Sequence, residues 1–513
     1  WLATDQGLYQ FKFEGELQPI FKLSDTPFST SDDDLVTMLE DREGVLWFGT
    51  KADGVFKWRP NFAIKKHLWS KGHKQFKLNN DSVYAIHKDQ DENLWVGTSN
   101  GLTFVNTENW SSQTYLVNSD EKAVDTASSI YNIHENNGKL WLETGAGIKV
   151  YDKQTMTQEK VLFPETKEKL FNKHGVSLHF VSEKQLMVVG YEGLYDYDLS
   201  RGTIDFIEST ANKGNYKNNY FNFFNTLPAN PNQRFIAGVD KIYLFSLDTK
   251  KSTTFHQIKS NKVKDLLPAG IHQEGDNLWV SYPGHGIYQL DYITGKELNF
   301  LSEKELGANS VMDIFSDKSG NLWITSNDGL FRVNKLNLQI TKFDRNDGFA
   351  SSEFNGGTAS SLDSGEALLG SVKGLYLFEP EKSIDKKVFP VKPLITGVNL
   401  LSSNIGSSLA SFNNETIELN HQDFGLKVEF SAMLLDKPEQ VKYFYWIEGD
   451  SKIDKIPVGE SELFFPRFSP GKNSIYISAV DYRNGLEEEQ ERKEKRKKII
   501  LTVAISIFLL IAT

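Results

Sequence analysis

Cysteine is absent from this chain of 513 residues. Its absence excludes disulfides and CxxC motifs, but it does not identify the compartment, because it is compatible with an oxidising one. HExxH, GxSxG and P-loop phrases are also missing, so no common catalytic motif marks an active site. The formal net charge of −11, with no nucleic-acid-binding motif to offset it, argues against nucleic acid as a partner.

A phrase centred on tryptophan recurs along almost three-quarters of the chain. Its clearest copies are LWFGT (46–50), NLWVGTSNGL (93–102), KLWLETGAGI (139–148), NLWVSYPGHGI (277–287) and NLWITSNDGL (321–330). The equivalent key positions, 44 to 48 residues apart, are Trp1, Trp47, Trp95, Trp141, Met187, Phe235, Trp279, Trp323 and Leu368. Self-similarity at this interval indicates propeller blades or a solenoid array.

Each copy reads as four short strands, and no stretch of the repeat region keeps a helical period. In the best copy the expected strands are 83–89, 94–98, 102–106 and a segment near 113–117. Asn100 and Gly101 supply the positive φ that the hairpin between the second and third strands needs. Four-stranded antiparallel units are typical of propeller blades. We therefore expect the key tryptophans to pack between neighbouring blades and not to form a ligand site.

The spacing predicts an all-β fold with a seven-bladed β-propeller over residues 76–388. Its closing strand is expected from residues 62–69, and residues 1–75 then hold the end of a preceding propeller and a junction. A single eight-bladed ring is the alternative. Because the chain does not begin with Met and starts inside a repeat, we interpret it as a fragment.

The phrase D-x-x-G-x-LW-x-G-T-x-x-GL resembles the two-component regulator propeller repeat of extracytoplasmic sensor regions. DREGVLWFGT (41–50) and DKSGNLWITSNDGL (317–330) are close to it, and residues 347–380 are similar to the last blade of that family. The resemblance covers about residues 1–380. The copies at Met187 and Phe235 depart from the pattern, because they lack the tryptophan.

Residues 389–485 have alternating strands with frequent turns, which predicts a small, Ig-like β-sandwich. The segment FSPGKNSIYISAVDYRNG (468–485) resembles the three-tyrosine module that follows such propellers. Tyr443, Tyr445 and Tyr476 stand where that family has tyrosines, and residues 463–465 (Leu-Phe-Phe) stand where another is expected. We expect these tyrosines to pack in a core or an interface.

Residues 486–513 complete the chain with a charged stretch and an apolar one. We expect a charged juxtamembrane helix at 486–498 and the start of a transmembrane helix at 499–513. The basic residues of 492–498 would lie on the propeller side of the membrane, against the usual positive-inside bias. The family resemblance nevertheless favours an inner-membrane protein with residues 1–498 extracytoplasmic.

Histidines are the first residues to consider for chemistry. His87, His134 and His272 precede the key tryptophan at one repeat position that other residues also occupy, so we expect neither a metal site nor a cofactor. His174 and His179 are expected on opposite faces of a strand.

We expect a ligand to bind to the loops that open on one face of the propeller. These are the loops entering each first strand and those between second and third strands. They are rich in amides, hydroxyls and tyrosines, which suits a polar small molecule or an oligosaccharide, although such residues are also common in turns. The candidate ligand-binding residues are Asn80, Asp81, Tyr191, Tyr220, Tyr282, Asn309, Asn327, Glu353 and Asn355.

The resemblance implies the ligand-sensing region of a transmembrane signalling protein, acting as a homodimer. It also implies a full-length sensor histidine kinase or diguanylate cyclase, whose catalytic part lies outside this chain. No catalytic residue is therefore expected here. Two alternatives remain open: a membrane-anchored propeller hydrolase or lyase of polysaccharides, and a propeller scaffold for another protein.

Overall fold

The structure is a computed structural model. It describes residues 1–5, 7–11, 17–21, 35–52, 54–59, 63–71, 77–115, 128–159, 176–190, 193–209, 222–223, 229–258, 266–308, 310–335, 340–383, 393–400, 416–419, 425–435, 438, 441–447, 454–456, 460–467, 471–481 and 499–505. In these ranges the fold consists of 42 strands with one short α-helix, α2 (Glu303–Leu306). The expected all-β class is confirmed.

Seven consecutive sheets of four antiparallel strands make up most of the chain. We number them 1 to 7 in chain order. Sheets 1 to 3 contain β8 (Val83–Lys88), β9 (Leu94–Thr98), β10 (Gly101–Asn106), β11 (Ser111–Tyr115); β12 (Ile130–Asn136), β13 (Lys139–Thr144), β14 (Gly147–Asp152), β15 (Gln158–Glu159); and β16 (Ser177–Ser182), β17 (Gln185–Gly190), β18 (Gly193–Asp198), β19 (Thr203–Ser209).

Sheets 4 to 6 repeat the same order of strands. They contain β20 (Asn222–Phe223), β21 (Gln233–Gly238), β22 (Lys241–Ser246), β23 (Lys251–Gln257); β24 (Gly270–Glu274), β25 (Asn277–Tyr282), β26 (Gly286–Asp291), β27 (Glu297–Ser302); and β28 (Val311–Ser316), β29 (Leu322–Ser326), β30 (Gly329–Val333), β31 (Ile340–Phe343). The four-strand repeat that the sequence predicts is therefore present.

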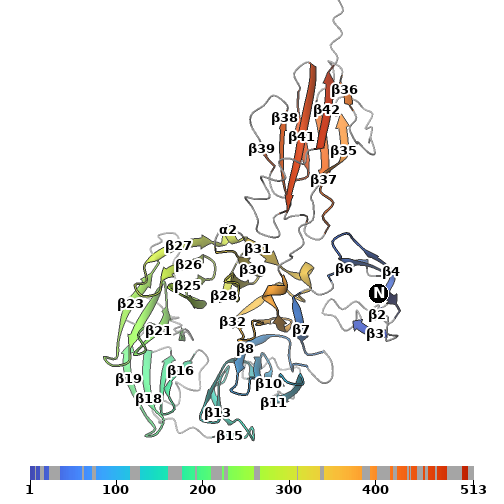
Figure 1. The fold of residues 1–513 in the computed structure, drawn as a ribbon. Coiled ribbons are helices and arrows are strands. Elements are labelled where there is room, and N and C mark those ends of the chain that lie inside the picture. Colours follow the sequence, from blue (N-terminus) through green and yellow to red (C-terminus); the bar gives the residue numbers. More distant parts are fainter. Residues whose placement is uncertain are drawn as a thin grey trace, which may run out of the picture. The chain divides into compact units, whose positions relative to one another are not determined.

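Sheet 7 takes its fourth strand from the beginning of the chain. Its own strands are β32 (Phe354–Ser361), β33 (Ala367–Ser371) and β34 (Gly374–Phe378), and β7 (Ile64–Leu68) pairs antiparallel with β34. Sheet 7 also contacts sheet 1, where Asn355 Nδ2 donates to the Val83 carbonyl over 2.7 Å. Figure 1 shows the sheets following one another around a centre, with first strands such as β8, β16 and β28 innermost. The sheets are thus propeller-like, and the strand expected from residues 62–69 is found in sheet 7.

The key residue of each of the seven four-stranded sheets is buried against the following sheet. Trp323 of sheet 6 is fully buried and meets the ring of Phe378 in sheet 7 edge-on, with centroids 5.1 Å apart. Trp95 of sheet 1 shares a core cluster with Leu142 of sheet 2, and Leu368 of sheet 7 shares one with residues of sheet 1. Large rings at this position fill the space between sheets, which confirms the expected packing role.

Two three-stranded sheets come before sheet 1 in the chain. They consist of β1 (Leu2–Thr4), β2 (Gly7–Phe11) and β3 (Leu17–Phe21), and of β4 (Leu35–Glu40), β5 (Leu46–Thr50) and β6 (Val55–Trp58). Trp1 meets Trp58 edge-on, with ring centroids 5.5 Å apart. These sheets carry the first two copies of the repeat, and their assignment to a preceding propeller remains a prediction.

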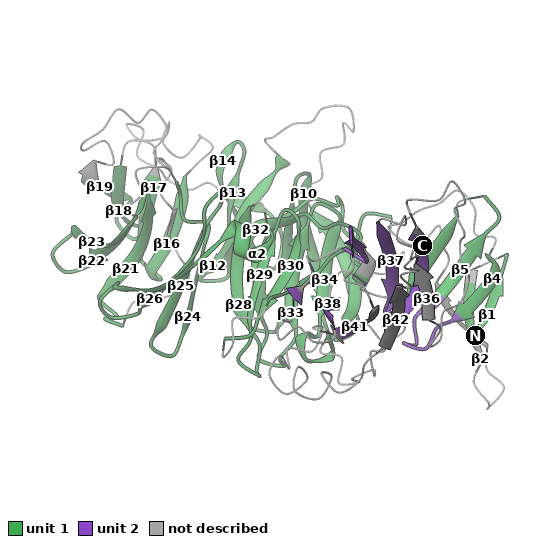
Figure 2. Ribbon diagram, turned by 90° about the horizontal axis from the view of Figure 1, so that it is seen from above, with its two compact units in different colours: residues 1–39, 47–383 green, residues 40–46, 384–513 purple. Residues whose placement is uncertain are grey.

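The chain divides into two compact units, residues 1–39 with 47–383 and residues 40–46 with 384–513 (Figure 2). The second unit has a three-stranded and a five-stranded sheet. Their strands are β35 (Leu394–Leu400), β37 (Leu426–Ser431) and β40 (Glu462–Phe465), and β36 (Thr416–Leu419), β42 (Ile499–Ile505), β41 (Gly471–Asp481), β38 (Val441–Ile447) and β39 (Asp454–Lys455). Val428 and Phe430 of the first sheet share one core cluster with Ile475 and Ile477 of the second.

Tyr443, Tyr445 and Tyr476 of this unit all make ring contacts. Tyr443 meets Phe430 edge-on at 4.9 Å, and its hydroxyl accepts a 2.9 Å hydrogen bond from the backbone N–H of Ala432. Tyr445 packs against Phe465, and Tyr476 stacks on Trp446 with centroids 5.2 Å apart. These contacts agree with the packing role expected from the sequence.

The C-terminal residues differ from the expectation. Residues 499–505 form the strand β42, antiparallel to β41 and parallel to β36, so the expected membrane helix is wrong for these residues. The run IILTVAI is rich in β-branched residues, and periodicity alone cannot distinguish a strand from a helix in a short apolar run. Residues 486–498 and 506–513 lie outside the described ranges. Among the residues that are described, none belong to a helix of the length and apolar character that a bilayer crossing requires.

Candidate functional site

The loops at one edge of the sheets are tied together by a recurring backbone hydrogen bond. In each case the turn between the second and third strands donates to a carbonyl at the start of the first strand. The bonds are Ser99 N to Ser82 O (3.0 Å), Gly145 N to Ser129 O (3.1 Å) and Asn327 N to Ser310 O (3.1 Å). Entering loops and second-to-third turns therefore share one edge in these sheets, as expected. We call this edge the loop face.

Asn80 and Asp81 hold the loop face together at sheet 1. Asn80 Oδ1 accepts a 2.7 Å hydrogen bond from the Ser99 hydroxyl. Asp81 Oδ1 accepts one of 2.7 Å from the backbone N–H of Ser70, and the Asp81 carbonyl accepts one of 2.7 Å from Gly374 N in sheet 7. Because these oxygens already accept hydrogen bonds, both residues first of all stabilise their loop.

Sheets 6 and 7 contribute the more accessible candidates. Asn355 is half-buried, since its side-chain amide donates to Val83 across the joint between sheets 7 and 1. Glu353 and Asn327 are exposed. The structure therefore gathers Asn80, Asp81, Glu353 and Asn355 near that joint, and places Asn327 on sheet 6.

Tyr282, which the sequence places among the exposed loop residues, is buried in the structure. It ends β25, where its side chain points into the core, and it is fully buried with its ring edge-on to Tyr288 at 5.7 Å. Burial raises the pKa of its hydroxyl far above the usual value. A ligand on the loop face does not reach this hydroxyl. Three other candidates, Tyr191, Tyr220 and Asn309, lie outside the described residues, as does His174.

Four histidines share one structural position, opposite the key residue of their sheet. The pairs are His87 with Trp95, His134 with Trp141, His179 with Met187 and His272 with Trp279. From there they contact the next sheet: His87 Nε2 lies 3.2 Å from Glu135 Oε2, and His272 Nε2 lies 2.9 Å from the Ser316 hydroxyl. No group of three acidic or histidine side chains that could hold a metal ion occurs in the described part of the chain.

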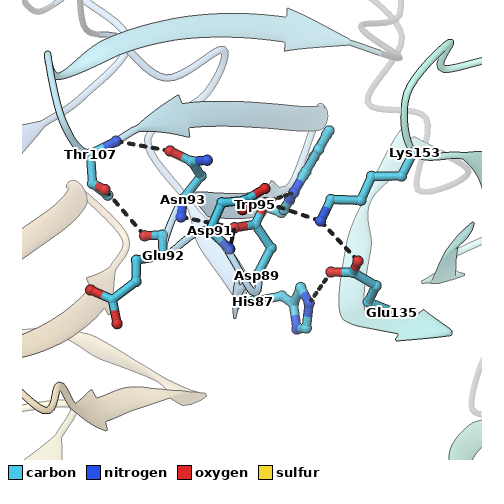
Figure 3. A network of polar contacts seen from close by, with 9 residues as sticks. All are labelled: His87, Asp89, Asp91, Glu92, Asn93, Trp95, Thr107, Glu135 and Lys153. Carbon is cyan, nitrogen blue, oxygen red and sulfur yellow. Dashed lines mark hydrogen bonds and ion pairs between the residues drawn. The ribbon is translucent and has the colours of Figure 1, made fainter. Parts of the chain in front are cut away.

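A chain of charged side chains joins sheets 1 and 2 (Figure 3). Asp89 Oδ2 accepts a 3.2 Å hydrogen bond from Trp95 Nε1 and lies 3.2 Å from the ammonium group of Lys153. Lys153 also lies 2.8 Å from Glu135, which in turn contacts His87. Burial lowers the pKa of His87, and the hydrogen bond to Glu135 opposes that shift. The sequence did not reveal this network, because its members come from two different repeats.

Asp313 is a buried acid that the sequence reasoning missed. It lies in β28, and its Oδ2 accepts hydrogen bonds from the backbone N–H groups of Thr358 (2.8 Å) and Ala359 (3.1 Å) in sheet 7. Burial raises its pKa from 3.8 to about 6, although these N–H groups stabilise the carboxylate. An aspartate inside the apolar strand VMDIF (311–315) was the signal that could have identified it.

The loop face thus offers amide, hydroxyl and carboxylate groups on a rigid set of strands. Such groups can fix the orientation of a polar ligand through hydrogen bonds. The exposed Glu353 and Asn327 are the candidates with the greatest access to a ligand.

Known proteins with similar sequences support the assignment of the repeats. A relative from Formosa agariphila named "Histidine kinase P4" is 23% identical over 347 residues, which cover 66% of this chain and only 22% of the relative. Two solved structures from B. thetaiotaomicron are also similar, and their names assign them to extracellular domains of hybrid two component systems. The first is 16% identical with a TM-score of 0.47, covering 98% of this chain and 67% of the other.

The second solved structure is 17% identical with a TM-score of 0.33, covering 98% of this chain and 82% of the other. The family model of the two-component regulator propeller matches residues 77–100 and 305–328, which contain Trp95 and Trp323. The chain therefore carries two-component regulator propeller repeats, as its sequence predicted.

Proposed function

We propose that this chain is the extracytoplasmic ligand-sensing region of a two-component signalling protein. The observation that carries the proposal is the two-component regulator repeat, which recurs in phase and matches the family model in sheets 1 and 6. The relative named as a histidine kinase supports the same reading. The chain itself contributes recognition, and its histidine kinase or diguanylate cyclase output is part of the proposal for the whole protein.

The seven four-stranded sheets are the blades of one closed propeller in this proposal. The pairing of β7 with β34 supports closure, because it joins the earliest of these strands to the last sheet. The ligand is a polar small molecule or an oligosaccharide bound on the loop face. The second unit, as an Ig-like sandwich, relays binding within a homodimer. The signal then depends on the difference in ligand affinity between two states of the relay.

A thermal-shift screen tests the proposal on the whole chain. The panel contains oligosaccharides, peptides and inorganic ions, each also analysed for breakdown products after incubation. A ligand that binds only the folded protein raises its melting temperature in a concentration-dependent way. Stabilisation by one class of polar ligand without product release supports sensing.

Variants locate the ligand on the loop face. Glu353→Gln and Asn327→Ala remove exposed polar groups there and should reduce the ligand-induced shift. Glu92→Gln is the control, because Glu92 lies in the turn between β8 and β9, at the other edge of sheet 1. Release of a shortened product would contradict the sensor proposal and favour a hydrolase or lyase. Stabilisation by a protein partner alone would favour the scaffold.

A further inference from the structure

Two tyrosines stack on each other at the loop face, on the first strands of neighbouring sheets. Tyr84 lies at the start of β8 in sheet 1 and Tyr131 at the start of β12 in sheet 2. Their ring centroids are 5.5 Å apart, and the ring planes are 14° from parallel. The two residues follow Ser82 and Ser129, whose carbonyls accept the recurring backbone hydrogen bond of the loop face. The pair therefore lies at the edge where the ligand is expected.

An irregularity in each strand aims these rings away from the core. The pairing of β8 with β9 shifts its register between Val83 and Ala85, and the pairing of β12 with β13 shifts between Ile130 and Asn132. Each tyrosine is the extra residue of a β-bulge, a feature that redirects a side chain and is common next to active sites. The first ring is half-buried and the second belongs to a residue that is 36% exposed, so a ligand can reach the pair.

Sheet 7, the other neighbour of sheet 1, has no side chain at the equivalent position. The residue eleven positions before the key residue is Tyr84 in sheet 1 and Gly357 in sheet 7. Gly356 and Gly357 are both exposed, and a Cβ on Gly357 would meet no atom within 4 Å. The adjacent Asn355 holds this segment against sheet 1, because its amide donates to a carbonyl of β8 over 2.7 Å. The glycines therefore leave open space next to the sheet that carries Tyr84.

These features favour a sugar ring as the group that binds here. A pyranose has a face of C–H groups that packs on an aromatic ring, and its hydroxyls form hydrogen bonds with polar groups nearby. The exposed carboxylate of Glu353 can accept such bonds. The charged side chains on this part of the loop face are Asp81, Glu353 and Lys373, so no excess of positive charge attracts an anion. A neutral saccharide therefore fits better than an acidic one.

We propose that Tyr84 and Tyr131 form a platform on which a neutral pyranose ring stacks, beside the space that Gly356 and Gly357 leave open. The inference rests on the proposed sensor function, since it concerns the ligand of the same loop face. Neither tyrosine was a candidate from the sequence, because only the bulges turn the two rings toward the ligand.

Isothermal titration calorimetry on the whole chain tests the proposal. The neutral probes are cellotetraose, laminaritetraose, xylotetraose and mannotetraose, and tetragalacturonate is the anionic probe. The wild type should bind at least one neutral probe with an affinity about tenfold or more above that for tetragalacturonate. In saturation-transfer NMR, the ring C–H protons of that probe should receive the strongest signal from the protein.

Variants of Tyr131 separate stacking from a structural role. Tyr131→Ala should lower the affinity for the neutral probe by about tenfold or more, whereas Tyr131→Phe, which keeps the ring, should stay within about threefold of the wild type. Phe206→Ala is the control and should leave binding unchanged. Phe206 is also an exposed aromatic residue, at 52%, but it lies in β19, the fourth strand of sheet 3.

A second variant keeps the test decisive if Tyr131→Ala fails to fold. Gly356→Leu adds a side chain whose Cβ would approach only the flexible end of Met312, at 3.9 Å, so the fold should tolerate it. It should fill part of the open space and weaken binding of the neutral probe. Unchanged binding by both Tyr131→Ala and Gly356→Leu would overturn the platform, as would equal binding of tetragalacturonate.

The outcome for the platform can be distinguished from the outcome for the sensor. If no neutral probe binds, but a peptide or an ion stabilises the chain in the thermal-shift screen, the platform is wrong and the sensor proposal stands. If a neutral probe binds through Tyr131 and is then cleaved, the platform stands and the sensor proposal is wrong.

Discussion

The indole N–H of Trp323 donates a 2.7 Å hydrogen bond to Oδ2 of Asp317, and both residues are buried. Oδ1 of the same aspartate accepts a 2.8 Å bond from the backbone N–H of Asn321. Trp95 and Asp89 repeat the relationship in sheet 1. An aspartate six residues before the key tryptophan therefore both shapes the turn and satisfies the indole in these two sheets.

Asp317→Ala should destabilise the protein, because it leaves the Trp323 N–H and the Asn321 backbone without their acceptor. The loss of several buried hydrogen bonds should cost about 2–4 kcal/mol, seen as a lower melting temperature in calorimetry. Glu274→Ala is the control, since the half-buried ion pair of Glu274 with Lys335 should contribute no more than about 1 kcal/mol. Equal effects of the two substitutions would contradict the role of Asp317.

His179 should make the protein sensitive to acid. Arg234 Nε donates a 2.8 Å hydrogen bond to His179 Nε2, which requires a neutral imidazole. Burial, together with the charge of Arg234, lowers the pKa of His179 from 6.5 to about 4. Between about pH 6.5 and pH 4, His179 is therefore protonated in the unfolded chain but neutral in the folded protein. The free energy of unfolding falls as the pH drops through this range.

This pKa shift corresponds to a contribution to the free energy of unfolding on the order of 3 kcal/mol. His179→Gln keeps an acceptor for Arg234 but does not titrate. The difference in melting temperature between pH 7.5 and pH 5 should therefore be smaller in this variant than in the wild type. An unchanged difference would show that His179 does not titrate as the structure implies.

Much of the repeat architecture could be predicted, because the hydrophobic period and the turn residues act locally. Gly101, expected to supply positive φ before the third strand, has φ = 103°. The strand 64–68 could be assigned to the last sheet because that repeat lacked its own fourth strand. Seven similar repeats also predict that each key residue packs on the next sheet.

Features that depend on contacts between repeats could not be predicted. Tyr282 occupies a turn-proximal position in the sequence, but β25 is buried on both faces from Leu278 to Tyr282, which places this side chain in the core. The Asp89–Lys153 pair becomes visible only when two repeats are placed side by side. The apolar run of residues 499–505 was assigned to a membrane helix because its composition suits a helix and a strand equally well.

Asp313 should give a pH dependence of the opposite sign to that of His179. Its pKa is raised from 3.8 to about 6 by burial, so the folded protein holds a proton that the unfolded chain releases. Stability is therefore lost as the pH rises from about 3.8 to 6, by an amount on the order of 3 kcal/mol, and is constant above that range.

Asp313→Asn isolates this contribution, because an amide oxygen can still accept from Thr358 N but does not titrate. Melting temperatures of the variant and the wild type are compared at half-unit intervals from pH 4 to pH 7. Relative to the wild type, the variant should gain stability as the pH rises through this window. Parallel curves would show that the carboxyl group does not carry the raised pKa.

Gly374 should be essential where β7 joins sheet 7. It has φ = 112°, a region that L-residues rarely adopt, and its N–H donates to the Asp81 carbonyl over 2.7 Å. A Cβ at this position would lie 2.2 Å from the carbonyl oxygen of Leu68, so a side chain would push β7 away from β34. Gly284 also has a positive φ of 79°, but no atom lies within 4 Å of the place where its Cβ would be.

The comparison of Gly374→Ala with Gly284→Ala therefore separates backbone strain from the collision with β7. The control should lose about 1 kcal/mol from strain alone, whereas Gly374→Ala should lose at least about 2 kcal/mol more, because backbone must move. Hydrogen exchange should become faster specifically in β7 of Gly374→Ala. If both variants have the same melting temperature and exchange in β7 is unchanged, a side chain at position 374 does not disturb the pairing of β7 with β34.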